Sequence, residues 1–180
     1  MTKIIWMVRA VFYKIFMKKF GLLSYLGKPC YVSGISRFFF GRKVRIYPNS
    51  RIESLGGVIH IGDNVSIGQN LHLISCRDVQ IGENTTISAN AFISDVDHEY
   101  EDIDVHVMEQ PLVKKTTIIG MNCFIGYGAV IRAGTKLGRQ CIVGANSVVK
   151  GEFPDYCVIA GNPAKIIKKY DVDSCQWERI

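Results

Sequence analysis

Aliphatic residues recur at every sixth position through much of the second half of the chain. The recurring residues are all Ile, Leu or Val: Ile61, Ile67, Leu73, Ile81, Ile87, Ile93, Ile119, Ile125, Ile131, Leu137, Val143 and Val149. A six-residue step agrees with the two-residue alternation of a strand and does not fit the 3.6-residue period of a helix. A fixed short repeat is typical of a solenoid, in which each coil buries its apolar residue only against its neighbours.

Small and polar residues keep a fixed phase relative to this aliphatic position. Glycine often follows it directly, and Asn or Gly often stands three residues after it. Asn and Gly tolerate a positive φ, so their recurrence predicts a corner in every repeat. Short strands joined by regular corners predict an all-β solenoid. An antiparallel sandwich is the alternative, but its strands vary in length and its turns keep no common phase.

The repeat is interrupted twice. The step from Leu73 to Ile81 is longer than six, which predicts a small bulge around Arg77. A second and much longer excursion spans residues 95–117 and is rich in charged residues. Loops carried by a rigid repeat scaffold are where function concentrates, so we expect the protruding loop 95–117 to be functional.

Residues 1–27 are predicted as a basic amphipathic helix, continuous from residue 2 to about residue 26. Two roles are open for it. It lies on the cytoplasmic face of a membrane, with its lysines near lipid phosphates and its aromatic residues in the interface, or it covers the end of the coil stack as a cap. The aromatic residues in question are Trp6, Phe12, Phe16 and Phe20, and the basic ones are Arg9, Lys14, Lys18 and Lys19.

The rest of the chain divides into a solenoid and a tail. Residues 28–170 are predicted as one solenoid domain, whose imperfect early coils keep the six-residue step at Ile46, Ile52 and Val58. Residues 171–180 are predicted as a short helix or a loose tail.

Composition and charge narrow the class of protein. The chain has 180 residues, of which 48% are hydrophobic and 21% charged, and these values are ordinary for a globular domain. The net charge of +6 suits an anionic partner, either a phosphorylated small molecule or a membrane surface. We expect no nucleic-acid partner, because no recognition motif is present. No stretch is long enough to span a bilayer.

The six cysteines form no C-x-x-C pair. Cys123 and Cys141 fall on the small inward phase of the repeat, where they are interpreted as buried apolar residues. We therefore expect reduced thiols and a cytoplasmic location.

The repeats and the segments around them resemble the hexapeptide-repeat acyltransferases. The motifs that carry this resemblance are I-G-D-N-V-S, I-G-E-N-T-T, I-G-M-N-C-F, V-G-A-N-S-V and V-I-A-G-N-P-A-K-I-I-K-K. The excursion D-V-D-H-E-Y, the Gln110–Pro111 pair and the terminal Q-W-E-R-I are most similar to the bacterial branch that O-acetylates sugars. That branch includes galactoside and maltose acetyltransferases and the acetyltransferases of O-antigen, capsule and exopolysaccharide synthesis. The resemblance covers about residues 40–170 and implies a left-handed parallel β-helix, assembled as a homotrimer with active sites between subunits.

The resemblance places His98 at the family's catalytic position. A sugar hydroxyl is a poor nucleophile near neutral pH, and histidine is the usual base for such a group. His98 is therefore the expected general base, with acetyl-CoA as the co-substrate and a sugar or glycan as the acceptor. Asp95 and Asp97 are expected either to orient the imidazole or only to cap the turn that enters the loop. The other histidines, His60, His72 and His106, match no motif, and His60 and His72 are interpreted as surface or structural residues.

The resemblance also implies a coenzyme A site. The residues expected along the pantetheine arm are Phe124, Gly126, Tyr127, Gly144 and Ala145, and those expected near the nucleotide and its phosphates are Lys150, Lys165 and Lys168. Glycine permits close approach of a ligand to the backbone, and lysine is suited to phosphate. No metal is expected in this site.

Three other functions remain as alternatives. The first is N-acetylation of an amino sugar or nucleotide sugar on the same fold. A more remote alternative is a non-catalytic β-helix scaffold. A gamma-type carbonic anhydrase is equally remote, because it needs three histidines around zinc and the spacing of the four histidines does not match that pattern.

Overall fold

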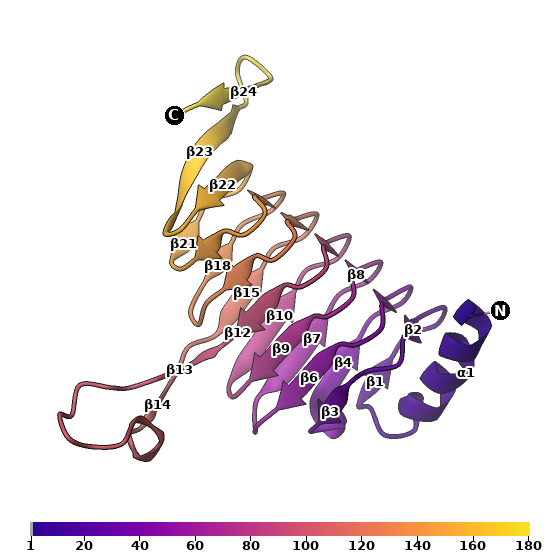
Figure 1. Cartoon of the computed structure of the whole chain (residues 1–180). Helices are drawn as coiled ribbons and strands as arrows, with labels where there is room; N and C mark the ends of the chain where they lie inside the picture. The colour runs from indigo at the N-terminus through magenta and orange to yellow at the C-terminus, as the bar shows by residue number, and fades with distance from the viewer. Residues whose placement is uncertain (1) are drawn as a thin grey trace.

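A computed structural model describes the backbone of residues 2–180 and the side chains of residues 4–180. The chain winds through three sheets, here called sheets A, B and C, in that order in each coil, and about seven coils stack into a column (Figure 1). Within these sheets, strands of successive coils pair parallel, and only the last three strands of sheet B pair antiparallel with one another. This architecture confirms the predicted left-handed parallel β-helix. The two termini lie at opposite ends of the column.

The strands of the three sheets are short. Sheet A contains β1 (Lys19–Phe20), β4 (Phe38–Phe40), β7 (Val58–Ile61), β10 (Asp78–Ile81), β15 (Thr117–Ile119), β18 (Lys136–Leu137) and β21 (Glu152–Phe153). Sheet B contains β2 (Tyr25–Leu26), β5 (Arg45–Ile46), β8 (Ser66–Ile67), β11 (Thr86–Ile87), β16 (Phe124–Ile125), β19 (Ile142–Val143), β22 (Cys157–Gly161), β23 (Ala164–Asp171) and β24 (Gln176–Arg179). Sheet C contains β3 (Tyr31–Ser33), β6 (Arg51–Ser54), β9 (His72–Ser75), β12 (Phe92–Ser94), β17 (Val130–Ile131) and β20 (Val148–Val149).

Four further elements lie outside the stacked coils. They are the helix α1 (Thr2–Lys14), the strands β13 (Val96–His98) and β14 (Leu112–Lys114), and the short 3-10 helix η2 (Val107–Glu109). A second 3-10 turn, η1 (Ile35–Arg37), joins β3 to β4.

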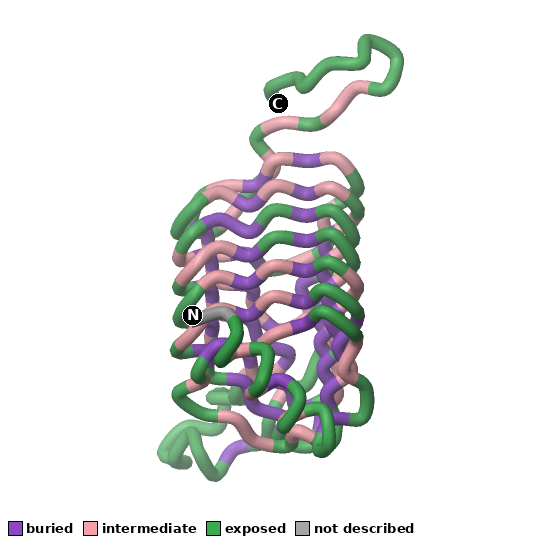
Figure 2. The backbone as a smooth tube through the Cα atoms, turned by 90° about the vertical axis from the view of Figure 1, so that its right-hand side faces the viewer, coloured by how far each residue is buried: buried purple, intermediate pink, exposed green. Residues whose placement is uncertain are grey.

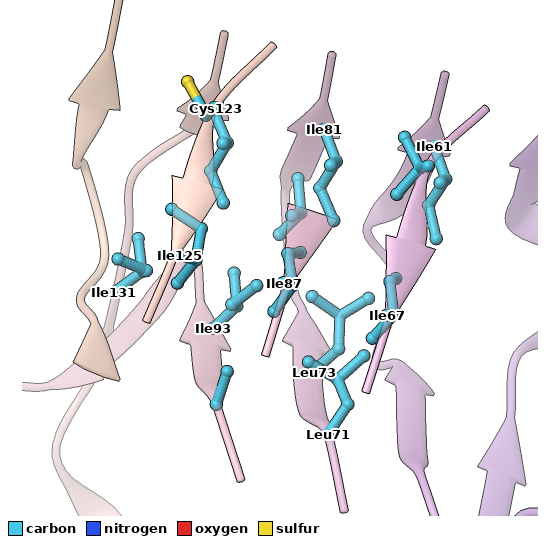
Figure 3. Packing of buried hydrophobic residues seen from close by; sticks show 14 of the residues in the cluster. Ile61, Ile67, Leu71, Leu73, Ile81, Ile87, Ile93, Cys123, Ile125 and Ile131 are labelled. Carbon is cyan, nitrogen blue, oxygen red and sulfur yellow. The ribbon is translucent and has the colours of Figure 1, made fainter. Parts of the chain in front are cut away.

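The aliphatic repeat forms the core. All twelve residues of the six-residue pattern point inward and are at most 2% exposed. Figure 3 shows several of them, from Ile61 to Ile131, stacked in rows from coil to coil. Figure 2 shows the same regularity along the backbone, where buried positions recur in columns along the stack. Each coil therefore depends on its neighbours for burial of its apolar residues.

Asparagines form the corners, as predicted. Asn64, Asn84 and Asn122 adopt φ values of 57–59° between sheets A and B, and Asn70 and Asn90 adopt similar values between sheets B and C. Asparagine visits this left-handed region more readily than most residues. The side chains also link successive coils, with 2.9 Å between Asn64 Nδ2 and Asn84 Oδ1.

The amino-terminal helix is shorter than predicted. It ends at Lys14, and the chain forms the first coil from Lys19 onward. The reason is that Phe20 and Leu26 already keep the six-residue step, and Leu26 is buried in the core. The helix covers this first coil: Ala10 is buried and Trp6 packs on Tyr25, with 5.7 Å between ring centroids. The capping role is confirmed by these contacts.

Two other predictions of local structure were wrong. Val58 is half-buried, and the inward residues of β7 are Ile59 and Ile61, because the corner around Gly57 is one residue longer than the corner between β9 and β10. The tail is neither a helix nor loose: β24 pairs antiparallel with β23, and the Tyr170 and Trp177 rings contact each other at 5.5 Å between centroids. These cross-strand contacts order the carboxyl-terminal residues.

Candidate active site

The excursion folds into a hairpin that leaves the column between sheets C and A (Figure 1). β13 and β14 pair antiparallel, and His98 lies opposite Leu112. Backbone hydrogen bonds extend the pairing at both ends, from Glu99 N to Pro111 O at 3.0 Å and from Lys115 N to Asp95 O at 2.8 Å. His98 is exposed at the outer end of β13, so its imidazole is accessible to a ligand.

Asp95 anchors the root of the hairpin. Its side chain is 0% exposed, and its carboxylate accepts hydrogen bonds from Ser75 Oγ at 2.7 Å and from the backbone N–H groups of Cys76 and Arg77 at 2.6 and 2.8 Å. These donors form the corner of the preceding coil. Within the described residues, no hydrogen bond joins Asp95 to His98. The contacts are those of a turn cap, although the capped turn belongs to the preceding coil and not to the loop entrance.

Asp97 anchors the hairpin from the other side. Its carboxylate forms an ion pair with Arg132, which follows β17 in the next coil. Both side chains are partly exposed. The hairpin is thus tied to the coil before it through Asp95 and to the coil after it through Asp97. The role of Asp97 in orienting His98 stays a prediction.

The tip of the hairpin is ordered by one buried amide. Gln110 Nε2 donates to Asp102 O at 3.1 Å and to Val105 O at 2.9 Å, and Gln110 Oε1 accepts from Asp102 N at 3.2 Å. The Gln–Pro pair singled out in the sequence therefore has a structural task. Several large apolar side chains of the tip remain exposed, and Ile103 is 88% exposed.

Most of the predicted donor residues share one surface. Phe124 stands on the outer face of sheet B, in register with Ile142, Val158 and Lys168 across β16, β19, β22 and β23. Tyr127 lies at the adjoining corner between sheets B and C, and both aromatic rings are exposed. We call the outer face of β16, β19, β22 and β23 with this corner the sheet B surface.

A β-bulge places two lysines together on the sheet B surface. Lysines three apart in a regular strand point to opposite faces. The register of β22 with β23 shifts between Val158 and Ile159, so that Lys168 lies opposite Val158 and Lys165 opposite Ala160. Because directly opposed residues share a face, both lysines point to the outer side of sheet B.

The glycines of the corner are explained by the stacking of coils. A Cβ atom on Gly126 would lie 2.6 Å from Ala145 N, so the close neighbour of Gly126 is the next coil. Gly144 is less crowded, because a Cβ atom on Gly144 would lie 3.1 Å from its nearest neighbour, Ala160 Cβ. Tyr127 is held at this corner by a hydrogen bond from Asn90 to its hydroxyl group.

Lys150 is separated from the other predicted donor residues. It follows β20 at the corner between sheets C and A, and its side chain is exposed. The sheet B surface and Lys150 thus lie at different edges of sheet C. The structure of one chain does not bring them together, nor does it bring His98 to the sheet B surface.

The chain resembles a bacterial acetyltransferase over most of its length. It is 35% identical over 161 residues to the putative lipopolysaccharide biosynthesis O-acetyl transferase WbbJ of Escherichia coli K12, covering 84% of this chain and 81% of that protein. A model of the hexapeptide repeat of succinyl-transferase matches residues 58–95 and 116–150. This chain belongs to the hexapeptide-repeat acyltransferase family. The galactoside O-acetyltransferase of the same organism is 31% identical over 118 residues, covering 64% of this chain and 56% of that protein.

Two solved structures of acyltransferases share the fold. An N-acyltransferase from Bacillus cereus, AntD, in complex with dTDP and coenzyme A, superposes with a TM-score of 0.78 at 18% identity, covering 91% of this chain and 90% of that one. A galactoside acetyltransferase in complex with coenzyme A superposes with a TM-score of 0.63 at 22% identity, covering 92% of this chain and 72% of that one. The protein is an acetyltransferase of this family.

One groove on the surface of the described residues lies away from the predicted site residues. It has a volume of about 550 Å³ and runs along the outer face of sheet A, lined by Phe39, His60, Gln80 and Ile118. None of the predicted site residues lines it. Within residues 2–180, no three His, Cys, Asp or Glu side chains gather as a metal-binding group.

Sequence reasoning did not anticipate two groups of residues near the hairpin. Ser75 binds Asp95, and Arg132 binds Asp97. Both partners lie at the corner between sheets C and A in the coils before and after the hairpin, so an alignment of these corners in the sequence identifies them. His72 was interpreted as a structural residue, but it lies beside the buried carboxylate of Glu53. The alternation of β6 alone identifies Glu53 as outward-facing, and no pattern predicts its burial.

Proposed function

We propose that the protein is an acetyl-CoA-dependent O-acetyltransferase that modifies a sugar hydroxyl during synthesis of a bacterial surface polysaccharide such as O-antigen, capsule or exopolysaccharide. The observation that carries this proposal is the position of His98, exposed at the end of a hairpin that is anchored to two coils. The similarity to a lipopolysaccharide O-acetyl transferase supports the acceptor class.

The proposed reaction needs a base and a leaving thiol. His98 accepts the proton of the acceptor hydroxyl as the oxygen attacks the carbonyl carbon of the acetyl thioester. The tetrahedral intermediate collapses with cleavage of the carbon–sulfur bond. The thiolate of coenzyme A leaves and takes the proton back from the His98 imidazolium. Asp97 is proposed to act indirectly, by holding β13 against the next coil through Arg132.

The donor is proposed to lie along the sheet B surface. Phe124, Tyr127 and the backbone around Ala145 would face the pantetheine arm. Lys165 and Lys168, which share the outer face of the sheet, would meet the nucleotide phosphates, where two positive charges favour an anion. Lys150 lies at the corner between sheets C and A, and we propose that it meets the coenzyme bound to the sheet B surface of a neighbouring subunit.

A homotrimer is proposed as the working unit. In one chain, His98 and the sheet B surface belong to different corners of the coil. The exposed apolar residues of the hairpin tip, Tyr100, Ile103 and Met108, would also be covered if the hairpin reached a neighbouring subunit. A site between two subunits joins the base of one chain to the donor surface of the next.

N-acylation of an amino sugar or nucleotide sugar is the second candidate. It is supported by the shared fold of the N-acyltransferase AntD, which was solved in complex with dTDP and coenzyme A. His98 would serve the amine as it serves the hydroxyl, by accepting a proton during attack.

The test is mass spectrometry of the surface glycan from cells with and without the protein. O-acetylation predicts the loss of an acetyl mass that mild base also removes from the glycan of the parent cells. Loss of an acetyl group that resists mild base would support N-acylation. An unchanged glycan in cells lacking the protein would reject both assignments to surface polysaccharide.

The amino-terminal segment is proposed to hold the enzyme at the cytoplasmic face of an anionic membrane. One side of α1 packs on the first coil, and the other presents the exposed apolar residues Ile4, Val8, Val11 and Phe12. This surface is continued by Ile15 and Phe16 after the helix and by Leu22 and Leu23 of the first coil. Lys14, Lys18 and Lys19 border this surface, and their charge suits lipid phosphates. Trp6 and Phe20 are partly buried, because their rings pack against Tyr25 and Phe40 of the first coils. In the described residues, no helix is long and apolar enough to cross a bilayer.

This membrane contact is tested with the triple substitution Lys14→Gln, Lys18→Gln and Lys19→Gln. We expect the affinity for vesicles in which about a third of the lipid is anionic to fall several-fold at physiological salt. The reason is that each lysine near the membrane surface contributes about 1 kcal/mol to binding. The matched control replaces three lysines that lie far from the amino-terminal segment in the sequence, Lys114, Lys115 and Lys136, with Gln. If the first variant stays folded and binds these vesicles as the parent does, the segment serves only as a cap.

A further inference from the structure

Sheet C carries a second histidine beside a carboxylate. His72 is in register with Arg51 and Phe92 on the outer face of the sheet, and Glu53 stands on the same face of β6. Although Glu53 points outward, it is only 5% exposed. Its Oε1 atom contacts Arg51 Nε and lies 3.6 Å from His72 Nε2. A carboxylate that is buried to this extent needs polar partners, and those of Glu53 are Arg51 and His72.

The neighbours of His72 fix the direction of its ring. The Nε2 atom is buried and makes no hydrogen bond, while the side chain as a whole is 39% exposed. The exposed area therefore belongs to the other atoms of the side chain. The Phe92 ring meets the imidazole edge-on, with 5.2 Å between centroids. A carboxylate beside one nitrogen favours the proton there, which leaves the other nitrogen as a hydrogen-bond acceptor.

The cluster lies on the sheet from which the hairpin arises. β9 begins at His72 and ends at Ser75, the residue whose hydroxyl holds Asp95. β12 begins at Phe92 and leads directly into the hairpin. On the other side of His72, toward the amino-terminal coils, the Arg51 guanidinium lies 5.1 Å from the centroid of the Tyr31 ring. Along this row of the outer face of sheet C, the polar residues Arg51 and His72 thus lie between the aromatic rings of Tyr31 and Phe92.

We propose that His72 and Glu53, with the Phe92 and Tyr31 rings beside them, form a binding site for the hydroxyl groups of the acceptor sugar. This inference rests on the proposed acetyltransferase function and adds the surface that recognises its acceptor. His72 accepts a hydrogen bond from a sugar hydroxyl at Nδ1, and Glu53 is a positioning residue that holds the imidazole. The aromatic rings offer apolar area to the C–H groups of the sugar ring. No bond is made or broken at this site.

The test compares His72→Asn and Glu53→Gln with the parent enzyme as full-length proteins. The probes are de-O-acetylated surface polysaccharide from the cells that make the protein, methyl β-galactoside and maltose. We expect the acceptor KM to rise about ten-fold in each variant, since a lost hydrogen bond to a substrate group weakens binding by about this factor. The acetyl-CoA KM and the slow hydrolysis of acetyl-CoA without acceptor should not change. The double variant should be no worse than His72→Asn, because Glu53 acts through His72.

His60→Asn is the matched control, because His60 also stands on an outer face, stacked on Phe39 of sheet A. It should leave the acceptor KM unchanged. An unchanged acceptor KM in both His72→Asn and Glu53→Gln, with only a lower melting temperature, would overturn the proposal and make the cluster structural. If His72→Asn does not fold, His72→Gln replaces it in the same comparison. If the parent transfers acetyl to none of the probes, the proposed function itself fails, and the inference fails with it.

Discussion

At the scale of single residues, two carboxylates with nearly the same place in the sequence do different work. Asp95 is fully buried and binds the corner of one coil, whereas Asp97 is half-exposed and pairs with Arg132 of another. The sequence predicts that both belong to the functional loop. It does not tell them apart, because their partners lie far along the chain and come together only when the coils stack. The exposed position of His98 follows from this two-sided attachment of the hairpin.

Asp95→Asn tests the anchoring role. The amide would present N–H groups where the carboxylate now accepts hydrogen bonds from Ser75 and Arg77, so we expect a loss of about 1–3 kcal/mol in the free energy of unfolding. Urea denaturation measures this loss, with the exposed Glu101→Gln as a control that should stay within about 0.5 kcal/mol of the parent. Reduced turnover with unchanged stability would instead assign Asp95 to the orientation of His98.

Glu53 predicts a pH dependence of stability. The hydrogen bond from Arg51 lowers the pKa of Glu53 below its ordinary value of 4.5, and His72 acts in the same direction. A depressed pKa stabilises the fold above the ordinary value, and the stabilisation is lost as the pH falls through the lower folded-state pKa. Glu53→Gln should therefore be less stable than the parent at about pH 7, and the difference should narrow at about pH 3. Urea midpoints that differ equally at both pH values would contradict this interpretation.

At the scale of elements, regular and irregular features differ in how well the sequence predicts them. The coils from Ile61 to Val149 follow from the six-residue pattern, because burial in a stack requires that period. The first coil escaped prediction, since Phe20 and Leu26 lie in an apolar run that also suits a helix. The bulge of β23 is invisible in the sequence, because it arises from pairing with β22. It nevertheless decides that Lys165 and Lys168 share a face.

The lysine pair gives a prediction at this scale. Changing Lys165 and Lys168 to Ala should raise the acetyl-CoA KM about five- to thirty-fold and leave kcat nearly unchanged, because distant phosphates are bound alike in ground and transition states. Added salt should narrow the difference. Lys169→Ala is the matched control, since Lys169 lies opposite Cys157 on the other face of β23. A double variant with the acetyl-CoA KM of the parent would mean that this basic strand does not bind the donor.

At the scale of the whole molecule, the sequence predicts the solenoid and its protruding loop, but one chain does not complete the site. His98 and the sheet B surface lie at different corners of the coil, and the proposed trimer would join them between subunits. The acceptor is the least predictable part, because sugar recognition depends on side chains such as Glu53 and His72 whose proximity no repeat encodes. The proposed trimer follows from this incompleteness.

The trimer is tested by sedimentation of the active enzyme. Three chains of 20.2 kDa should sediment as a species of about 60 kDa, and activity should fall on dilution below the assembly range. Ile103→Asp at the exposed hairpin tip should weaken assembly if the tip contacts a neighbour. Val172→Asp, in the exposed turn between β23 and β24, should not. An active monomer would contradict the proposal that the active site is shared between subunits.

The most direct test of the central claim is the rate of acetyl transfer by His98→Ala under saturating acetyl-CoA. Loss of a general base predicts a fall in kcat by a factor of about 10²–10⁴. Acetyl-CoA binding and the melting temperature should remain those of the parent, because the His98 side chain is exposed and Asp95 and Asp97 still anchor the hairpin. The predicted result is a folded enzyme that binds its donor and transfers almost no acetyl. Turnover near that of the parent would contradict the assignment of His98 and the mechanism that depends on it.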